Sequence, residues 1–183
     1  VSFWSAASEH KKGGFSIGVI GRREVGCEEL VSILGEKVNV PLSIQPPLSD
    51  LMKVFEEPLS KTLYWMDAFL ILSPIYQFGG APEWALLRWA IKQNRPVFLV
   101  ASATGRRGGL SGEIREELLQ YEIQPLQQEI GSFTWGGFTP PSNSSSSSQE
   151  DKDLETIIEQ VLDWKRVSQQ LHAQTLLRNL ELV

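Results

Sequence analysis

Asp67-Ala68-Phe69-Leu70-Ile71-Leu72-Ser73-Pro74 is the stretch that decides the fold, because residues 68–72 are the most apolar run in the chain. A short, unbroken apolar run bounded by turn-forming residues is typical of a strand that is buried on both faces of a sheet. We therefore expect residues 68–72 to form the central strand. Working outward, similar apolar runs at residues 15–20 and 96–101 predict two further buried strands.

The segments between these strands carry apolar residues at helical spacing. This spacing predicts helices over residues 24–34, 48–59, 82–92 and 111–121, and a long final helix from Asp151 onward. Gly35 is expected to cap the first of these helices at its carboxyl end.

Two further strands are expected on weaker patterns. Residues 38–44 are β-branched but contain Pro41, which favours a strand near the edge of the sheet. Residues 123–130 alternate with polar residues and are predicted as the fifth strand, with Trp135 in the loop that follows.

Strands that alternate with amphipathic helices indicate a parallel sheet with helices on both faces. Five such units favour a flavodoxin-like α/β sandwich of three layers with the strand order 2-1-3-4-5. We expect residues 1–14 to be a tail, residues 15–170 to be one domain with a flexible serine-rich loop at 140–150, and residues 171–183 to be a helical extension.

Composition narrows the class of protein. The 183 residues have a formal net charge of −5, which argues against nucleic acid as the main partner. No apolar run approaches the ~18 residues that a membrane-spanning helix needs. One cysteine and two histidines provide neither an internal disulfide nor the usual four-ligand zinc site. We expect a protein of a reducing compartment, either the cytoplasm or an organelle interior reached after removal of a targeting segment.

In an open parallel sheet, ligands bind outside the carboxyl ends of the strands. Three predicted loops meet there, at residues 21–26, 73–80 and 102–109. Two of them contain an arginine pair, which in an acidic protein suggests an anionic ligand. Each arginine pair taken alone is also consistent with a solvated surface, and Tyr76 and Phe78 are also consistent with capping of the core. Cys27 is interpreted as buried packing.

Residues 67–77, followed by Leu87-Arg88-Trp89-Ala90-Ile91, resemble the NAD(P)H-dependent FMN reductase family. Its members carry a strand ending in Pro-x-Tyr-Asn, then a Pro and Gly turn, then a helix that opens Leu-Lys-Asn-Ala. Residues 96–109 are similar to the family's second flavin-contacting segment. The resemblance covers residues 15–167 and is strongest over residues 67–121.

The resemblance implies FMN at the strand ends, NAD(P)H as the electron donor and a small acceptor such as a flavin or quinone. It implies no catalytic side chain, because the flavin performs the hydride chemistry, and no metal. It further implies a homo-oligomer. The residues placed at the flavin ring are Pro74, Ile75, Tyr76, Gln77, Phe78, Thr104, Gly105, Arg106 and Gly108. Arg22 and Arg23 are expected to serve the phosphate.

The sequence also departs from the family pattern. The first loop of the family reads Gly-Ser-x-Arg-x-x-Ser, whereas residues 21–27 read Gly-Arg-Arg-Glu-Val-Gly-Cys and contain no hydroxyl residue. Gln77 replaces the usual Asn. These departures leave an alternative open, namely a non-catalytic subunit or scaffold with a decayed flavin site, held in a larger complex. A leucine-rich end to the final helix suggests a partner surface, through Leu171, Leu176, Leu177, Leu180 and Leu182.

Overall fold

The computed structural model describes residues 15–45, 63, 66–78, 80–103, 110–141 and 148–181. Its five strands form one parallel sheet in the order β2-β1-β3-β4-β5, as predicted. The strands are β1 (Ile17–Gly21), β2 (Leu42–Ile44), β3 (Ala68–Pro74), β4 (Val97–Ser102) and β5 (Thr134–Phe138). The central strand β3 is buried along its whole length, which confirms the role predicted for residues 68–72.

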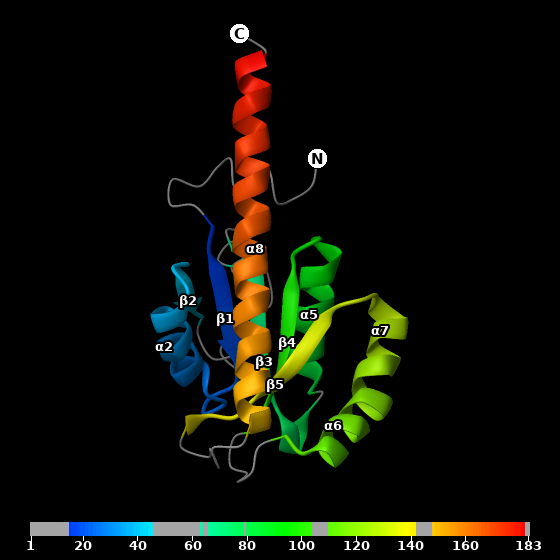
Figure 1. Cartoon of the computed structure of the whole chain (residues 1–183). Coiled ribbons are helices and arrows are strands. Elements are labelled where there is room, and N and C mark those ends of the chain that lie inside the picture. The colour runs from blue at the N-terminus through cyan, green and yellow to red at the C-terminus, as the bar shows by residue number, and fades with distance from the viewer. Residues whose placement is uncertain are drawn as a thin grey trace.

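Helices cover both faces of the sheet and complete a three-layer α/β fold of the flavodoxin-like type (Figure 1). One face packs against α2 (Cys27–Lys37) and the long α8 (Ser148–Glu181). The other face packs against α5 (Ala81–Lys92), α6 (Gly112–Leu118) and α7 (Gln124–Ile130). A short 3-10 turn, η1 (Ile75–Gln77), follows β3, and a π-helical turn, η2 (Leu119–Ile123), joins α6 to α7.

The predicted fifth strand is wrong. Residues 123–130 are helical and continue α6 through η2 into α7, while the fifth strand is Thr134–Phe138. The physical reason lies in the spacing of the buried residues, because Ile123 and Leu126 are three positions apart and fall on one helical face. Trp135 therefore lies within β5 and not in a loop after it.

The other boundaries shift by a few residues. The first helix starts at Cys27, and Gly35 lies inside it; Val38 caps the helix instead, and its amide donates to the carbonyl of Leu34 at 2.8 Å. Of the strand expected over residues 38–44, only β2 forms, since Pro41 comes directly before it. The helix expected over residues 48–59 lies outside the described residues, as does the tail at residues 1–14.

Within the described part of the chain, no helix combines the length and the apolar character required to cross a membrane.

Candidate functional site

A cavity of about 470 Å³ lies at the carboxyl ends of β1 and β2. The loop from Gly21 to Gly26, the first turn of α2, and Ile44 and Gln45 line it. Gly26 is the N-terminal cap of α2 and has a φ of 93°, a left-handed conformation that favours glycine. The N-terminus of α2 thus opens onto the cavity, in the place where such folds bind phosphate.

Arg22, which was predicted to bind phosphate, is held by an ion pair inside the protein. Its Nε lies 2.5 Å from Glu83 Oε1, and its Nη2 donates to Glu83 Oε2 at 2.9 Å. The Glu83 side chain is fully buried in the first turn of α5. The hydrogen bond with Glu83 raises the pKa of Arg22 above its ordinary value. A Cβ at Gly80 would collide with both side chains, so glycine at this position makes room for the pair.

The remaining charges around the cavity are mainly acidic. Three carboxylates line the cavity, those of Glu24, Glu28 and Glu29. Besides Arg22, its lining residues include one further guanidinium, that of Arg23. Since Glu83 pairs with Arg22, the three carboxylates of Glu24, Glu28 and Glu29 outnumber the one remaining guanidinium among the lining residues. This balance opposes the binding of a phosphate group.

Cys27 lies in the first turn of α2 and is half-buried. Burial, with the nearby carboxylate of Glu28 as the second cause, raises the pKa of this thiol from 9.0 to about 12. The space beside Gly21 is taken by Val25 and Cys27, because a Cβ on Gly21 would come within 2.5 Å of Val25 Cγ2 and 2.9 Å of Cys27 Sγ. The prediction that Cys27 serves in packing agrees with this environment.

The loop from Gly21 to Gly26 contacts residues at the carboxyl ends of β4 and β5. The buried hydroxyl of Ser102, at the end of β4, donates to the carbonyl of Val25 at 2.6 Å. A Cβ on Gly26 would meet Pro140 Cγ at 3.1 Å and Phe138 Cε2 at 3.3 Å, so the segment after β5 packs closely on the start of α2. The loop is therefore a fixed part of the fold at this edge of the sheet.

The second predicted group of site residues, Pro74 to Phe78, does not line this cavity. Pro74 is buried at the end of β3, and Ile75 packs against a small apolar cluster with Leu110 and Leu118. Phe78 contacts Trp84 edge-on, with ring centroids 5.3 Å apart. In this group Tyr76 stands out, because 66% of it is exposed at the carboxyl end of the sheet.

The described residues include only part of the predicted flavin site, so the site as a whole stays a prediction. Gln77 contributes its backbone to η1, but its side chain lies outside the described part of the structure. Thr104, Gly105, Arg106 and Gly108 also lie outside the described residues. Arg22 and Arg23 line the cavity at β1, and Phe78 packs on the other side of the sheet, in the cluster around α5.

The loop after β1 also carries a spacing signal that was not among the sequence predictions. Gly21 and Gly26 are separated by four residues and stand between a buried strand and a helix, which is the spacing of the phosphate-binding loop Gly-x-x-x-x-Gly-Lys-Ser/Thr. In this chain Cys27 and Glu28 occupy the positions of the lysine and the hydroxyl residue. The role of Glu83 was not predicted either, because this residue lies on a helix that is distant in sequence from the loop.

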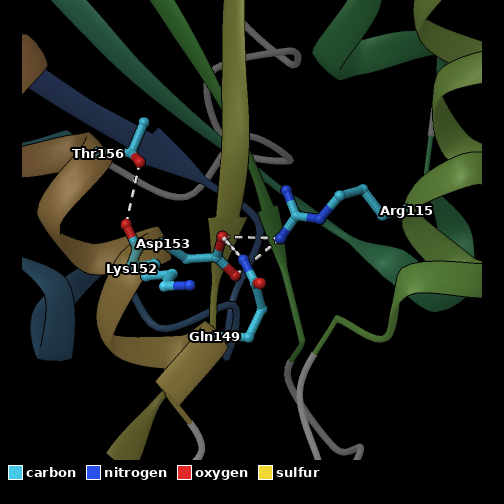
Figure 2. Close-up of polar contacts among 5 residues, drawn as sticks. All are labelled: Arg115, Gln149, Lys152, Asp153 and Thr156. Atoms are coloured by element: carbon cyan, nitrogen blue, oxygen red, sulfur yellow. Dashed lines mark hydrogen bonds and ion pairs between the residues drawn. The ribbon is translucent and has the colours of Figure 1, made fainter.

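A second buried charge lies at the carboxyl end of β5. Asp153 of α8 accepts hydrogen bonds from Arg115 of α6 at 2.7 and 2.9 Å and from Gln149 at 3.0 Å, as Figure 2 shows. The Arg115 guanidinium also lies 5.8 Å from the centre of the Trp135 ring. This cluster joins α6 to α8, and its donors and acceptors satisfy one another.

Among the described residues, no three His, Cys, Asp or Glu side chains come together in a way that would hold a metal ion.

Comparisons with known proteins give similarity in fold only. The chain matches no protein-family model and no curated protein. It is similar in structure to the translation elongation factor SelB from Methanococcus maripaludis, with a TM-score of 0.59, 14% identity, and coverage of 81% of this chain and 33% of that one. It thus spans about a third of the length of that factor.

Two further structures are similar. The FeoB G-domain from Methanococcus jannaschii has a TM-score of 0.52 and 10% identity, with coverage of 83% of this chain and 97% of that one. General stress protein 14 from Treponema denticola, solved in complex with FMN, has a TM-score of 0.40 and 13% identity, with coverage of 84% and 99%. The first two similarities show the fold alone, and the third is too weak to support an argument.

Proposed function

We propose that the chain is a non-catalytic subunit or scaffold, built on a nucleotide-binding type of fold whose phosphate loop no longer binds phosphate. The observation that carries this proposal is the pair Cys27 and Glu28 directly after the Gly21–Gly26 loop. A phosphate loop needs a lysine there for the phosphates and a hydroxyl for Mg²⁺. A neutral thiol and a carboxylate supply neither.

The surroundings of the loop support the proposal. Arg22 is a cation of this loop that could have replaced the missing lysine. Its guanidinium, however, forms an ion pair with the buried Glu83. Val25 and Cys27 fill the space beside Gly21. The FMN phosphate fits this loop poorly for the same reasons, since it would face Glu24 and Glu28 without a hydroxyl donor in the loop.

The test is a binding titration on the full chain with FMN, GDP and GTP, the last two with Mg²⁺. Isothermal titration calorimetry is expected to detect no saturable binding at ligand concentrations up to several hundred micromolar. Micromolar affinity for any of the three would overturn the proposal.

A designed variant tests whether residues 21–28 align with the phosphate-loop motif in the way that we assign. Cys27→Lys combined with Glu28→Ser recreates the phosphate-loop sequence, and we expect it to bind magnesium pyrophosphate more tightly than the parent chain does. Cys27→Met with Glu28→Gln is the matched control, because it removes the same two groups without adding a cation or a hydroxyl. Equal affinity of both variants for pyrophosphate would contradict the alignment of residues 21–28 with the phosphate-loop motif.

A second candidate function is the NAD(P)H-dependent FMN oxidoreductase that the sequence resemblance implies. The exposed Tyr76 favours it, because this residue carries the Pro-x-Tyr resemblance and presents its ring at the carboxyl end of the sheet. In that case the protein would bind and orient the flavin, which supplies the hydride chemistry. An absorbance spectrum decides it: saturable FMN binding followed by bleaching with NAD(P)H would favour the oxidoreductase, and Tyr76→Ala should then weaken FMN binding.

A further inference from the structure

The strand β5 leaves one edge of the sheet open. It comes last in the order β2-β1-β3-β4-β5 and pairs only with β4 among the described residues. The carbonyl of Phe138 accepts a hydrogen bond from the amide of Ala103 at 2.9 Å, so Phe138 directs its backbone groups toward β4. Because this direction alternates along a strand, the backbone groups of Trp135 point away from β4. Trp135 therefore offers an N–H and a C=O to a further strand.

Only the first half of this edge is accessible. Thr134 is exposed and Trp135 is half-buried, whereas residues 136–138 are buried. Before the strand, the carbonyl of Phe133 accepts a hydrogen bond from the side chain of Gln127 at 2.9 Å, which fixes this segment against α7. The open part of the edge is thus a short, fixed stretch around Trp135, which an extended segment of a few residues can reach.

Two adjoining cavities lie beside this open edge, where β5 runs along α8 (Figure 1). Their volumes are about 540 Å³ and about 520 Å³. Thr134, Gln160 and Asp163 line both of them, so the two cavities form one groove, which we call the β5 groove. On the α8 side, Thr156, Glu159, Gln160 and Asp163 form its wall as one stripe at helical spacing. A further strand laid along β5 would occupy this groove.

The wall of the β5 groove is acidic. The 520 Å³ cavity is lined by Glu159 and Asp163, and its described lining residues include no Lys or Arg. The 540 Å³ cavity contains Arg95, which is buried. Asp163 is paired with the exposed Arg166 on the same helix. Glu159, in contrast, is exposed and makes no ion pair within the described part of the chain. Its carboxylate is therefore available to a basic group in the groove.

The negative charge of the whole protein is concentrated around this edge. Residues 110–164, which contain β5, the helices α6 and α7, and the first half of α8, carry 11 Asp and Glu against two basic residues, Arg115 and Lys152. The rest of the chain has 11 acidic and 15 basic residues. A charge distribution of this kind attracts a basic partner and repels an acidic one.

We propose that β5 binds an extended segment of a partner protein as a further strand, and that basic residues alternate with apolar ones in this segment. Its main chain pairs with the N–H and C=O of Trp135, in the way that peptides add to exposed sheet edges. Side chains of a strand point alternately to the two faces of a sheet. Those on the α8 side meet Glu159 and Asp163 and are Lys or Arg. Those on the other side meet Phe133 and Trp135, which pack in the apolar clusters of that face.

This binding site goes beyond the proposed function and does not depend on it. The strand β5 lies at the opposite edge of the sheet from β2, and the β5 groove shares no described lining residue with the cavity at the phosphate loop. Failure of nucleotide or flavin binding therefore leaves the proposal unchanged, and failure of peptide binding leaves the proposed function unchanged.

Fluorescence anisotropy of a labelled peptide, Lys-Val-Arg-Val-Lys-Val, titrated with the full chain tests the charge requirement. The expected dissociation constant is roughly 10–100 µM at low ionic strength. The matched peptide Glu-Val-Glu-Val-Glu-Val should bind about tenfold more weakly or worse. Glu159→Gln with Asp163→Asn should weaken binding of the basic peptide about fivefold. The matched control is Glu36→Gln with Glu181→Gln, which removes the same charge from exposed sites on α2 and at the end of α8 and should change the dissociation constant less than about twofold.

Hydrogen exchange measured by NMR tests the strand pairing. With saturating basic peptide, the amide of Trp135 should exchange about fivefold more slowly or less, because it gains a hydrogen bond. The amide of Gly136 is the internal control, since it already faces β4 and should not change. An unchanged exchange rate at Trp135 would overturn the addition of a strand. Equal binding of the two peptides, or no binding of the basic peptide up to about 1 mM, would overturn the basic segment as the occupant of the groove.

Discussion

At the scale of single residues, the thiol of Cys27 gives the clearest prediction of pH dependence. Its pKa is raised from 9.0 to about 12 in the folded state. Above about pH 9 the unfolded chain loses this proton while the folded chain keeps it. The stability that the neutral thiol contributes is therefore complete below pH 9 and is lost as the pH rises toward 12.

The measurement is the free energy of unfolding in urea for the parent chain and for Cys27→Ala. The difference between them should shrink by about 1.4 kcal/mol for each pH unit above pH 9. A difference that stays constant from pH 8 to pH 10 would contradict the burial of the thiol. The parent chain should also react slowly with iodoacetamide at pH 8, because the thiolate is the reactive form.

The buried carboxylate of Glu83 is the second residue to test. Glu83→Gln leaves the Arg22 guanidinium with a neutral partner in the interior, and we expect a loss of about 2 kcal/mol in the free energy of unfolding. Partial exposure of Arg22 keeps the loss below that of a fully buried pair. The control is Glu129→Gln, which breaks an exposed pair with Arg88 and should cost less than about 0.5 kcal/mol. Equal losses in the two variants would show that burial of Glu83 has no energetic effect.

At the scale of elements, two glycines with open surroundings differ only in backbone conformation. Neither Gly35, inside α2, nor Gly131, after α7, has an atom within 4 Å of an added Cβ. Gly131 has φ 105° and ψ 174°, a region almost restricted to glycine, whereas Gly35 is helical. Gly35→Ala should raise the free energy of unfolding by about 0.5–1 kcal/mol. Gly131→Ala should lower the free energy of unfolding by about 1–3 kcal/mol. Stabilisation by both substitutions would contradict the restriction of position 131 to glycine.

The same elements explain what the sequence could and could not predict. The strands β1, β3 and β4 are buried on both faces and are therefore continuous apolar runs, which the sequence shows directly. β5 was missed because Gly136 and Gly137 interrupt its apolar character, and these glycines are needed for close contacts with Phe98 and with Leu110. The ion pair of Arg22 with Glu83 was not predictable, since it joins residues 61 positions apart, one in the loop after β1 and the other in the first turn of α5.

At the scale of the whole molecule, the Arg115–Asp153 ion pair joins the two helical layers at the end of the edge strand β5. Arg115 belongs to α6 on one face, and Asp153 belongs to α8, which packs on the other. A Cβ on Gly137 would meet Leu110, Asp153 and Arg115 at 2.9, 3.0 and 3.5 Å, so the pair closes directly against the strand. This position protects the end of an edge strand that would otherwise be open to pairing with another chain.

A double-mutant cycle measures how strongly the layers are coupled. Asp153→Asn, Arg115→Met and the double variant should give an interaction energy of about 1–3 kcal/mol in urea unfolding, because Asp153 is almost fully buried. Asp163→Asn serves as the control, since its pair with Arg166 is exposed on a single helix and should contribute less than about 0.5 kcal/mol. Hydrogen exchange should show faster opening of the first turns of α8 in Asp153→Asn and not in the control Asp163→Asn. An interaction energy near zero would mean that the apolar contacts of α8, chiefly through Ile157, Val161 and Trp164, hold it to the sheet, and that the ion pair only fills the space beside Gly137.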